Sequence, residues 1–172
     1  SRYVLLNALG VRVKTSLSVV DSQTRLPLKN IAITIQGSEA LTNEEGYAEL
    51  DGLRLGRSEL VISKVGYADN SQLITLGWGS NPRGEQELLA TGEQFVFYTQ
   101  DWLSNKPITN AVAESGESSA RSDGDGKVTL VVGEDGIDEA KVTVRADGYR
   151  DETYSLNELL GVETTVSMVP AR

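Results

Sequence analysis

The side chains that most enzyme chemistry depends on are missing from this chain. It contains no His and no Cys, which removes imidazole and thiolate metal ligands, zinc sites, and nucleophiles activated by histidine. Carboxylates, lysines, tyrosines and hydroxyls remain, and no set of acid, base and nucleophile can be named among them. We therefore expect a protein that is not an enzyme and holds no cofactor.

One acidic stretch has the residue types of a cation site. Asp123 and Asp125 alternate with glycines in residues 123–126, which is similar to part of a calcium loop. In the register of an EF-hand loop, Arg121 and Val132 would occupy the first and last positions, where acids are required. Asp-Gly is also the preferred sequence of a tight hairpin turn. We expect a structural turn without a tight metal site, with calcium binding as the alternative.

Three aromatic residues are candidates for contact with a ligand. Trp78 lies in the glycine-rich stretch 77–84, which predicts an exposed loop, while Tyr98 and Trp102 lie close to a predicted turn at Asp101. Exposed aromatic rings stack on sugars, but they also cover the junction between domains. Both interpretations stay open: a carbohydrate contact near a groove between domains, or packing between the domains.

The distribution of charge argues against nucleic acid as a partner. The net charge is −9. Residues 12–91 hold eight basic and ten acidic side chains, and residues 92–172 hold seven basic and fifteen acidic ones. Neither half can present the broad basic surface that binds phosphates. No apolar run approaches the roughly 18 residues that cross a membrane, so we expect no membrane span.

The spacing of residues along the chain indicates an internal duplication. Five residues of the first half recur 80 positions later: Asp21 and Asp101, Pro27 and Pro107, Asn30 and Asn110, Gly46 and Gly126, Leu50 and Leu130. A fixed period is typical of a duplicated structural unit, and this one has the length of a small domain. We expect an N-terminal arm at residues 1–11, one domain at residues 12–91 and a second at residues 92–172.

Apolar residues alternate with polar ones through most of both halves. The pattern is clear in residues 31–36, 128–132 and 142–146, and it predicts strands with one buried and one solvated face. Turn residues separate these segments every 8–12 positions. The fold class expected is all-β: two tandem antiparallel seven-stranded β-sandwiches, transthyretin-like or immunoglobulin-like, of Greek-key type.

Four short motifs make the first half similar to a known family. They are Leu17 to Asp21, Leu26 to Ile33, Leu41 to Leu53 and Glu59 to Tyr67, and the second half matches the same motifs more loosely. In this order they resemble the carboxypeptidase regulatory-like domain, a transthyretin-like sandwich. The resemblance implies non-catalytic accessory modules, which in bacteria occur as stalks and tandem modules of surface proteins.

The N-terminal arm lies outside the duplication and contains apolar residues that need cover. We weigh three interpretations: the arm packs on the first domain, it follows a membrane anchor that has been removed, or it adds a strand to a neighbouring subunit. In the last case the inter-subunit strand would include Tyr3, Val4, Leu5, Leu6 and Leu9.

The sequence favours a structural function outside the cell. We expect a spacer, stalk or fibre subunit of a bacterial cell-surface or secreted protein, located outside the cell, on its surface or in the periplasm. Its partners would be proteins or further copies of itself, joined through the N-terminal arm. The alternative is an adhesion module that binds a carbohydrate or a protein through Trp78, Tyr98 and Trp102.

Overall fold

β-Strands are the dominant secondary structure of the chain, as the fold class predicted. A computed structural model describes residues 2–135 and 137–172, which divide into two compact units. One unit reaches to Lys64 and includes Ala68–Leu89, and the other consists of Val65–Tyr67 and Ala90–Arg172. The all-β expectation is confirmed, and each unit is described separately below.

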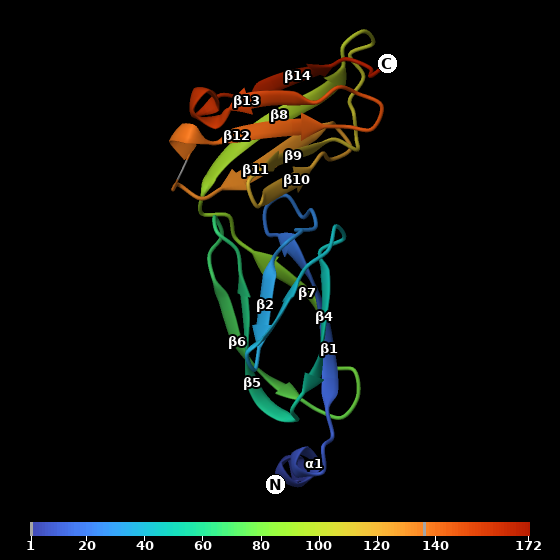
Figure 1. The fold of residues 1–172 in the computed structure, drawn as a ribbon, viewed down its shortest axis with the longest axis vertical. Coiled ribbons are helices and arrows are strands. Elements are labelled where there is room, and N and C mark those ends of the chain that lie inside the picture. The colour runs from blue at the N-terminus through green and yellow to red at the C-terminus, as the bar shows by residue number, and fades with distance from the viewer. Residues whose placement is uncertain (1, 136) are drawn as a thin grey trace. The chain divides into compact units, whose positions relative to one another are not determined.

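The first unit consists of a short N-terminal helix followed by two sheets (Figure 1). The sheets have the strand orders β4-β1-β7 and β3-β2-β5-β6. The elements are α1 (Arg2–Ala8), β1 (Val13–Asp21), β2 (Ala32–Ile35), β3 (Ser38–Leu41), β4 (Tyr47–Leu53), β5 (Gly56–Ser63), β6 (Asn70–Leu76) and β7 (Pro82–Leu88).

The second unit repeats this arrangement. Its sheets have the orders β11-β8-β14 and β10-β9-β12-β13. The elements are β8 (Glu93–Asp101), β9 (Val112–Ser115), β10 (Ser118–Arg121), β11 (Lys127–Val132), the 3₁₀ turn η1 (Ile137–Glu139), β12 (Lys141–Arg145), β13 (Glu152–Ser155), the 3₁₀ turn η2 (Leu156–Leu159) and β14 (Thr164–Met168).

The predicted alternation places one face of the central strands in a core. Ile31, Ile33 and Ile35 are almost fully buried, whereas Ala32 and Thr34 between them are partly exposed. In the second unit, Val128, Leu130, Val142 and Val144 are fully buried in one cluster of apolar side chains. Burying each such side chain stabilises the fold by about 1.5–3 kcal/mol, so each unit has its own apolar core.

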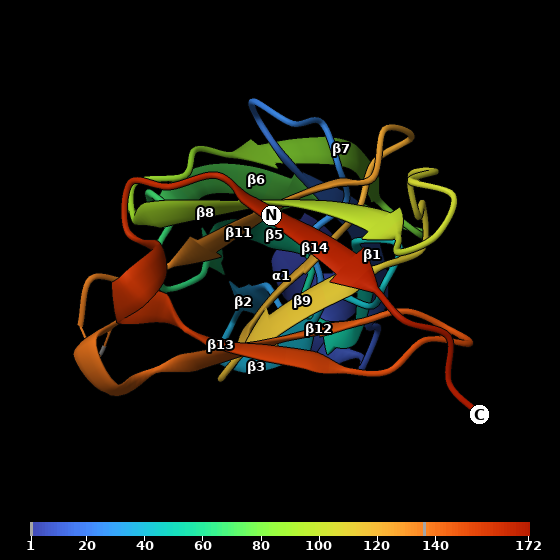
Figure 2. The same cartoon turned by 90° about the horizontal axis from the view of Figure 1, so that it is seen from above.

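The expectation of purely antiparallel sheets is wrong for one pair of strands in each unit. β1 and β7 are parallel, and so are β8 and β14. The strands β8 and β14 lie next to each other in Figure 1 and overlap in the view of Figure 2. The other ladders are antiparallel. The reason lies in the connection: β6 belongs to the four-stranded sheet, so the chain must cross to the other sheet to form β7. A crossing of this kind lets the last strand run in the direction of the first.

The N-terminal arm does not form the strand on which one of the three interpretations depends, because Tyr3, Val4, Leu5 and Leu6 lie in α1 and Leu9 follows it. The helix ends in a Schellman motif. The N–H of Val11 donates to the carbonyl of Leu6, and Gly10, at φ +84°, donates to the carbonyl of Asn7. Leucine and alanine favour a helix, and this closure at Gly10 stops it.

The first unit also supplies the partner that holds α1. The side-chain amide of Asn7 donates to the carbonyl of Leu55 at 2.9 Å and accepts the N–H of Leu55 at 2.8 Å. These two hydrogen bonds satisfy both backbone polar groups of a buried residue. Asn7 therefore holds the arm on its own unit, whereas Val4, Leu5 and Leu9 remain 68%, 61% and 70% exposed.

Candidate functional site

The aromatic candidates are distributed over the two units. Trp78 lies in the loop between β6 and β7 of the first unit and is 72% exposed. In the second unit, Tyr98 is a half-buried residue of β8, and Trp102 directly after that strand is 51% exposed. Both tryptophans are exposed, each on a unit of its own, and the sequence had predicted an exposed loop for Trp78.

The loop that carries Trp78 is held in shape by one side chain. Asn81, at φ +46°, accepts the N–H of Gly77 at 2.9 Å. Its amide nitrogen donates to the carbonyls of Gly77 at 2.9 Å and of Lys14 at 3.2 Å. An asparagine tolerates this left-handed backbone conformation and bonds to nearby backbone groups. The exposed ring of Trp78 is therefore carried by a braced loop.

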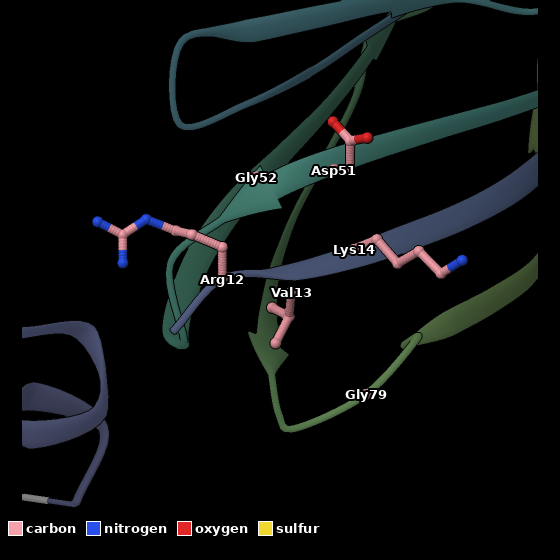
Figure 3. A pocket seen from close by; sticks show the side chains of 6 residues that line it. All are labelled: Arg12, Val13, Lys14, Asp51, Gly52 and Gly79. Atoms are coloured by element: carbon pink, nitrogen blue, oxygen red, sulfur yellow. The ribbon is translucent and has the colours of Figure 1, made fainter. Parts of the chain in front are cut away.

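A hollow of about 310 Å³ lies beside this loop, lined by Arg12, Val13, Lys14, Asp51, Gly52 and Gly79 (Figure 3). It forms at an irregularity of the β1–β4 ladder. Val13 pairs with Leu53 but Thr15 pairs with Leu50, so β4 carries one extra residue opposite Lys14. Such a bulge interrupts a ladder and re-aims the side chains around it.

The polar groups around the hollow are not arranged for catalysis. In Figure 3 the side chains of Arg12, Lys14 and Asp51 point away from one another. Arg12 donates to the carbonyl of Val11 at 2.8 Å, and Lys14 lies 3.6 Å from a carboxylate oxygen of Glu49. Both cations have partners already, so the hollow offers a polar surface beside Trp78 rather than a converging set of acid and base.

The acidic stretch of the second unit forms a turn. The carboxylate of Asp123 accepts the N–H groups of Asp125 at 2.9 Å and Lys127 at 3.0 Å. This is the hydrogen-bonding pattern of an Asx turn. Gly126 follows at φ +75°, as the hairpin interpretation required. One oxygen of Asp123 is thereby used by the turn itself.

Neither a metal centre nor a membrane span emerges from the part of the chain that the structure describes. Within residues 2–135 and 137–172, no group of three acidic side chains gathers closely enough to hold a metal ion. No helix in those ranges is long and apolar enough to cross a membrane.

Sequence reasoning missed a charged contact in the first unit. The guanidinium of Arg25, in the loop after β1, forms ion pairs with Glu85 and Glu87 on β7. The hydrogen bond with Glu87 is the main reason that the pKa of Arg25 is raised above its ordinary value. Comparison of the two halves could have revealed this contact. Its three charged residues are replaced 80 positions later by the uncharged residues Asn105, Thr165 and Ser167.

Comparison with known proteins gives likeness at the level of fold only. No protein-family model matches the chain, so the resemblance to the carboxypeptidase regulatory-like domain stays a prediction. No curated protein matches it either.

Several solved structures of bacterial proteins are similar over most of this chain. The Bacillus anthracis TIE protein is 14% identical over 92% of this chain and 34% of its own, with a TM-score of 0.38. A streptococcal ancillary pilin is 16% identical, covering 93% and 62%, with a TM-score of 0.35. The shaft pilin spaA of Lactobacillus rhamnosus GG is 10% identical, covering 94% and 98%, with a TM-score of 0.34.

The chain spans about a third of the Bacillus anthracis protein and less than two thirds of the streptococcal pilin. At these identities and TM-scores, the likenesses carry no argument about what this chain does.

Proposed function

We propose that this chain is a non-catalytic structural module, a spacer, stalk or fibre segment of a bacterial protein located on the cell surface or outside the cell. The proposal is supported by the structural features that occur in both units, which are turns held by hydrogen bonds between a side chain and the backbone. The carboxylate of Asp21 accepts the N–H groups of Gln23 and Thr24 at 2.8 and 3.0 Å. Asp101 does the same for Leu103 and Ser104, both at 2.9 Å.

Other repeated positions also serve the fold. The hydroxyl of Thr42 accepts the N–H of Ile31 at 2.9 Å, and its counterpart Ser122 accepts the N–H of Ala111 at 2.9 Å. Such bonds satisfy backbone groups where the ladder stops. Both units have thus kept the same turns and backbone closures.

Of the candidate ligand residues, Asp123 belongs to a turn that is repeated, because its counterpart Asn43 also accepts two backbone N–H groups, at 3.1 and 2.9 Å. The exposed Trp102 is not repeated, since its counterpart is Ser22. A binding protein needs one binding site, and a second unit that lacks this site does not contribute to binding. Two copies of a scaffold do add length, which is what a spacer supplies. This contrast is the observation that carries the proposal.

Independent folding of the two units is the test. Residues 1–91 and residues 92–172, expressed separately, should each unfold cooperatively, with melting temperatures near the corresponding transitions of the full chain. If either fragment remains unfolded while the full chain folds, the chain is one interdependent domain and the tandem spacer is refuted.

An adhesion module that binds carbohydrate is the second candidate, because Trp78 is exposed on a loop braced by Asn81. A glycan array with the wild-type chain separates the two functions. The spacer proposal expects no binding above background. A glycan that binds the wild type and Trp102→Phe but is lost in Trp78→Ala would establish the adhesion module instead.

A further inference from the structure

The first and last strands of each unit are neighbours that run in the same direction. In the first unit, β1 pairs with β7 from Ser16 opposite Pro82 to Asp21 opposite Leu88. In the second, β8 pairs with β14 from Phe97 opposite Thr164 to Asp101 opposite Met168. Because these strands are parallel, the chain enters each unit at one end of the pair and leaves it at the opposite end.

This geometry decides how a unit responds to tension. When the two ends of a unit are pulled apart, parallel terminal strands are dragged past each other along their length. The hydrogen bonds of the ladder then resist together. In an antiparallel terminal pair both ends of the chain would leave on the same side, and the bonds would open one after another. Shear of a whole ladder needs more force than opening it bond by bond.

We propose that β1 with β7, and β8 with β14, are shear clamps that allow each unit to carry tension along the chain. The proposal deepens the proposed function and rests on it for the setting in which tension arises. The clamp itself follows from the pairing of the strands.

Hydrogen bonds extend the clamp beyond the ladder in the first unit. Near the start of the ladder, the hydroxyl of Thr15 donates to the carbonyl of Asn81 at 2.7 Å. Beyond its end, the N–H of Ser22 donates to the carbonyl of Leu88 at 2.9 Å. The second unit has the equivalent terminal bond, from the N–H of Trp102 to the carbonyl of Met168 at 3.0 Å.

A charged contact reinforces the first clamp only. Arg25, which follows β1, reaches across to Glu85 and Glu87 on β7. Its backbone has φ +64°, a left-handed conformation that long side chains disfavour. The counterpart Asn105, at φ +58°, is a residue that adopts this conformation readily. In the first unit, the residue with the strained backbone is therefore Arg25, the same residue whose ion pairs connect the end of β1 to β7.

The direction of pulling tests the clamp without changing it. The chain has no Cys, so Ser80→Cys in the exposed β6–β7 loop gives a single attachment point. Pulling between the two termini loads the clamps in shear. Two unfolding events are expected, each releasing roughly 25 nm of chain at about 3.5 Å per residue.

Pulling the same variant between the N-terminus and the introduced thiol loads β1 and β7 at the same end and peels them apart. The unfolding force of the first unit should be several-fold lower than in terminal pulling. Equal forces in the two directions would overturn the clamp, because the ladder is identical in both experiments.

The reinforcement is tested by giving the first unit the residues of the second. The variant Arg25→Asn/Glu85→Thr/Glu87→Ser should lower the force of one of the two terminal-pulling events and leave the other unchanged. Its thermal stability reports separately on the fold. If neither force changes, the ion pairs do not reinforce the clamp.

These results are separable from those on the proposed function. Independent folding of both fragments together with equal forces in the two pulling directions would refute the clamp alone. Fragments that fail to fold alone would refute the tandem spacer, whatever the pulling forces are.

Discussion

Gly46 and Gly126 each lie in the turn before a strand, close to the backbone of the strand that pairs with it. Both have φ +75°, and a Cβ would lie 2.5 Å from the carbonyl oxygen of Val19 at Gly46 and of Thr99 at Gly126. Alanine at either position should therefore cost about 3 kcal/mol of unfolding free energy, from backbone strain and the close approach together. Urea unfolding measures this cost.

Gly37 separates the two contributions. It has φ +77°, but a Cβ added there would have no other atom within 4 Å. Alanine at Gly37 should lower the unfolding free energy by only about 1 kcal/mol, which is the cost of the left-handed conformation. If Gly46→Ala and Gly37→Ala cost the same, the close approach to Val19 is not what requires a glycine.

Asp101 should make the second unit sensitive to acid. Its carboxylate accepts the N–H groups of Ser104 and Leu103 and the hydroxyl of Tyr149, and the bond from Ser104 is the largest cause of its lowered pKa. Because the folded pKa lies below the ordinary value of 3.8, the stabilising contribution is complete above that value. It is lost as the pH falls through the folded pKa.

The variant Asp101→Asn cannot titrate at this position. We expect its melting temperature to fall less steeply than that of the wild type between about pH 4 and pH 2, as read by calorimetry. Asp125→Asn, at an exposed turn, is the matched control and should keep the wild-type slope. Wild-type and Asp101→Asn chains with the same slope would contradict the assigned role of Asp101.

At the scale of helices and strands, the sequence predicted the features that depend on neighbouring residues. It did not predict those that depend on residues far apart in the chain. The alternation of Ile31, Ile33 and Ile35 predicts a strand and its buried face because both depend on neighbouring residues. The parallel order of β1 and β7 depends on which sheet β6 joins, and no local pattern encodes that choice. The same holds for Arg25, whose partners lie 60 and 62 positions away.

For a different reason, the helix at the N-terminus was not predicted. Residues 3–9 form an apolar run too short for its period to distinguish a strand from a helix. The partner that decides the matter is Leu55, which bonds to Asn7 from 48 positions away. Only one part of the candidate site was predicted, for a similar reason. The exposure of Trp78 follows from nearby glycines, which are local. The bulge that forms the hollow depends on the pairing of β1 with β4, which is not local.

The contact between α1 and the first unit can be tested at Asn7. Replacing it with alanine removes two hydrogen bonds to the buried Leu55, so the unfolding free energy should fall by about 1–2 kcal/mol. Hydrogen exchange at the Leu55 amide should become faster. Leu9→Ala is the control, because Leu9 is 70% exposed, and it should leave that exchange unchanged. Unchanged exchange in Asn7→Ala would mean that α1 is not held by this contact.

At the scale of the whole molecule, the two units differ most in charge. The first unit holds nine basic and ten acidic side chains, whereas the second holds seven and fifteen. Like charges repel within a compact unit, and salt screens this repulsion. The first unit has little net charge to screen, and its Arg25 ion pairs are weakened by salt. Added salt should therefore stabilise the second unit and leave the stability of the first unit unchanged or slightly lower.

Each unit contains one tryptophan, which allows both effects to be read in one chain. Trp102→Phe leaves Trp78 as the reporter of the first unit, and Trp78→Phe leaves Trp102 as the reporter of the second. Raising NaCl from about 20 mM to about 500 mM shortens the screening length from roughly 20 Å to roughly 4 Å. The urea midpoint reported by Trp102 should then rise, because repulsion among the acidic side chains is reduced. The midpoint reported by Trp78 should stay constant or fall. Equal shifts of both midpoints would show that net charge does not set the stability of the two units.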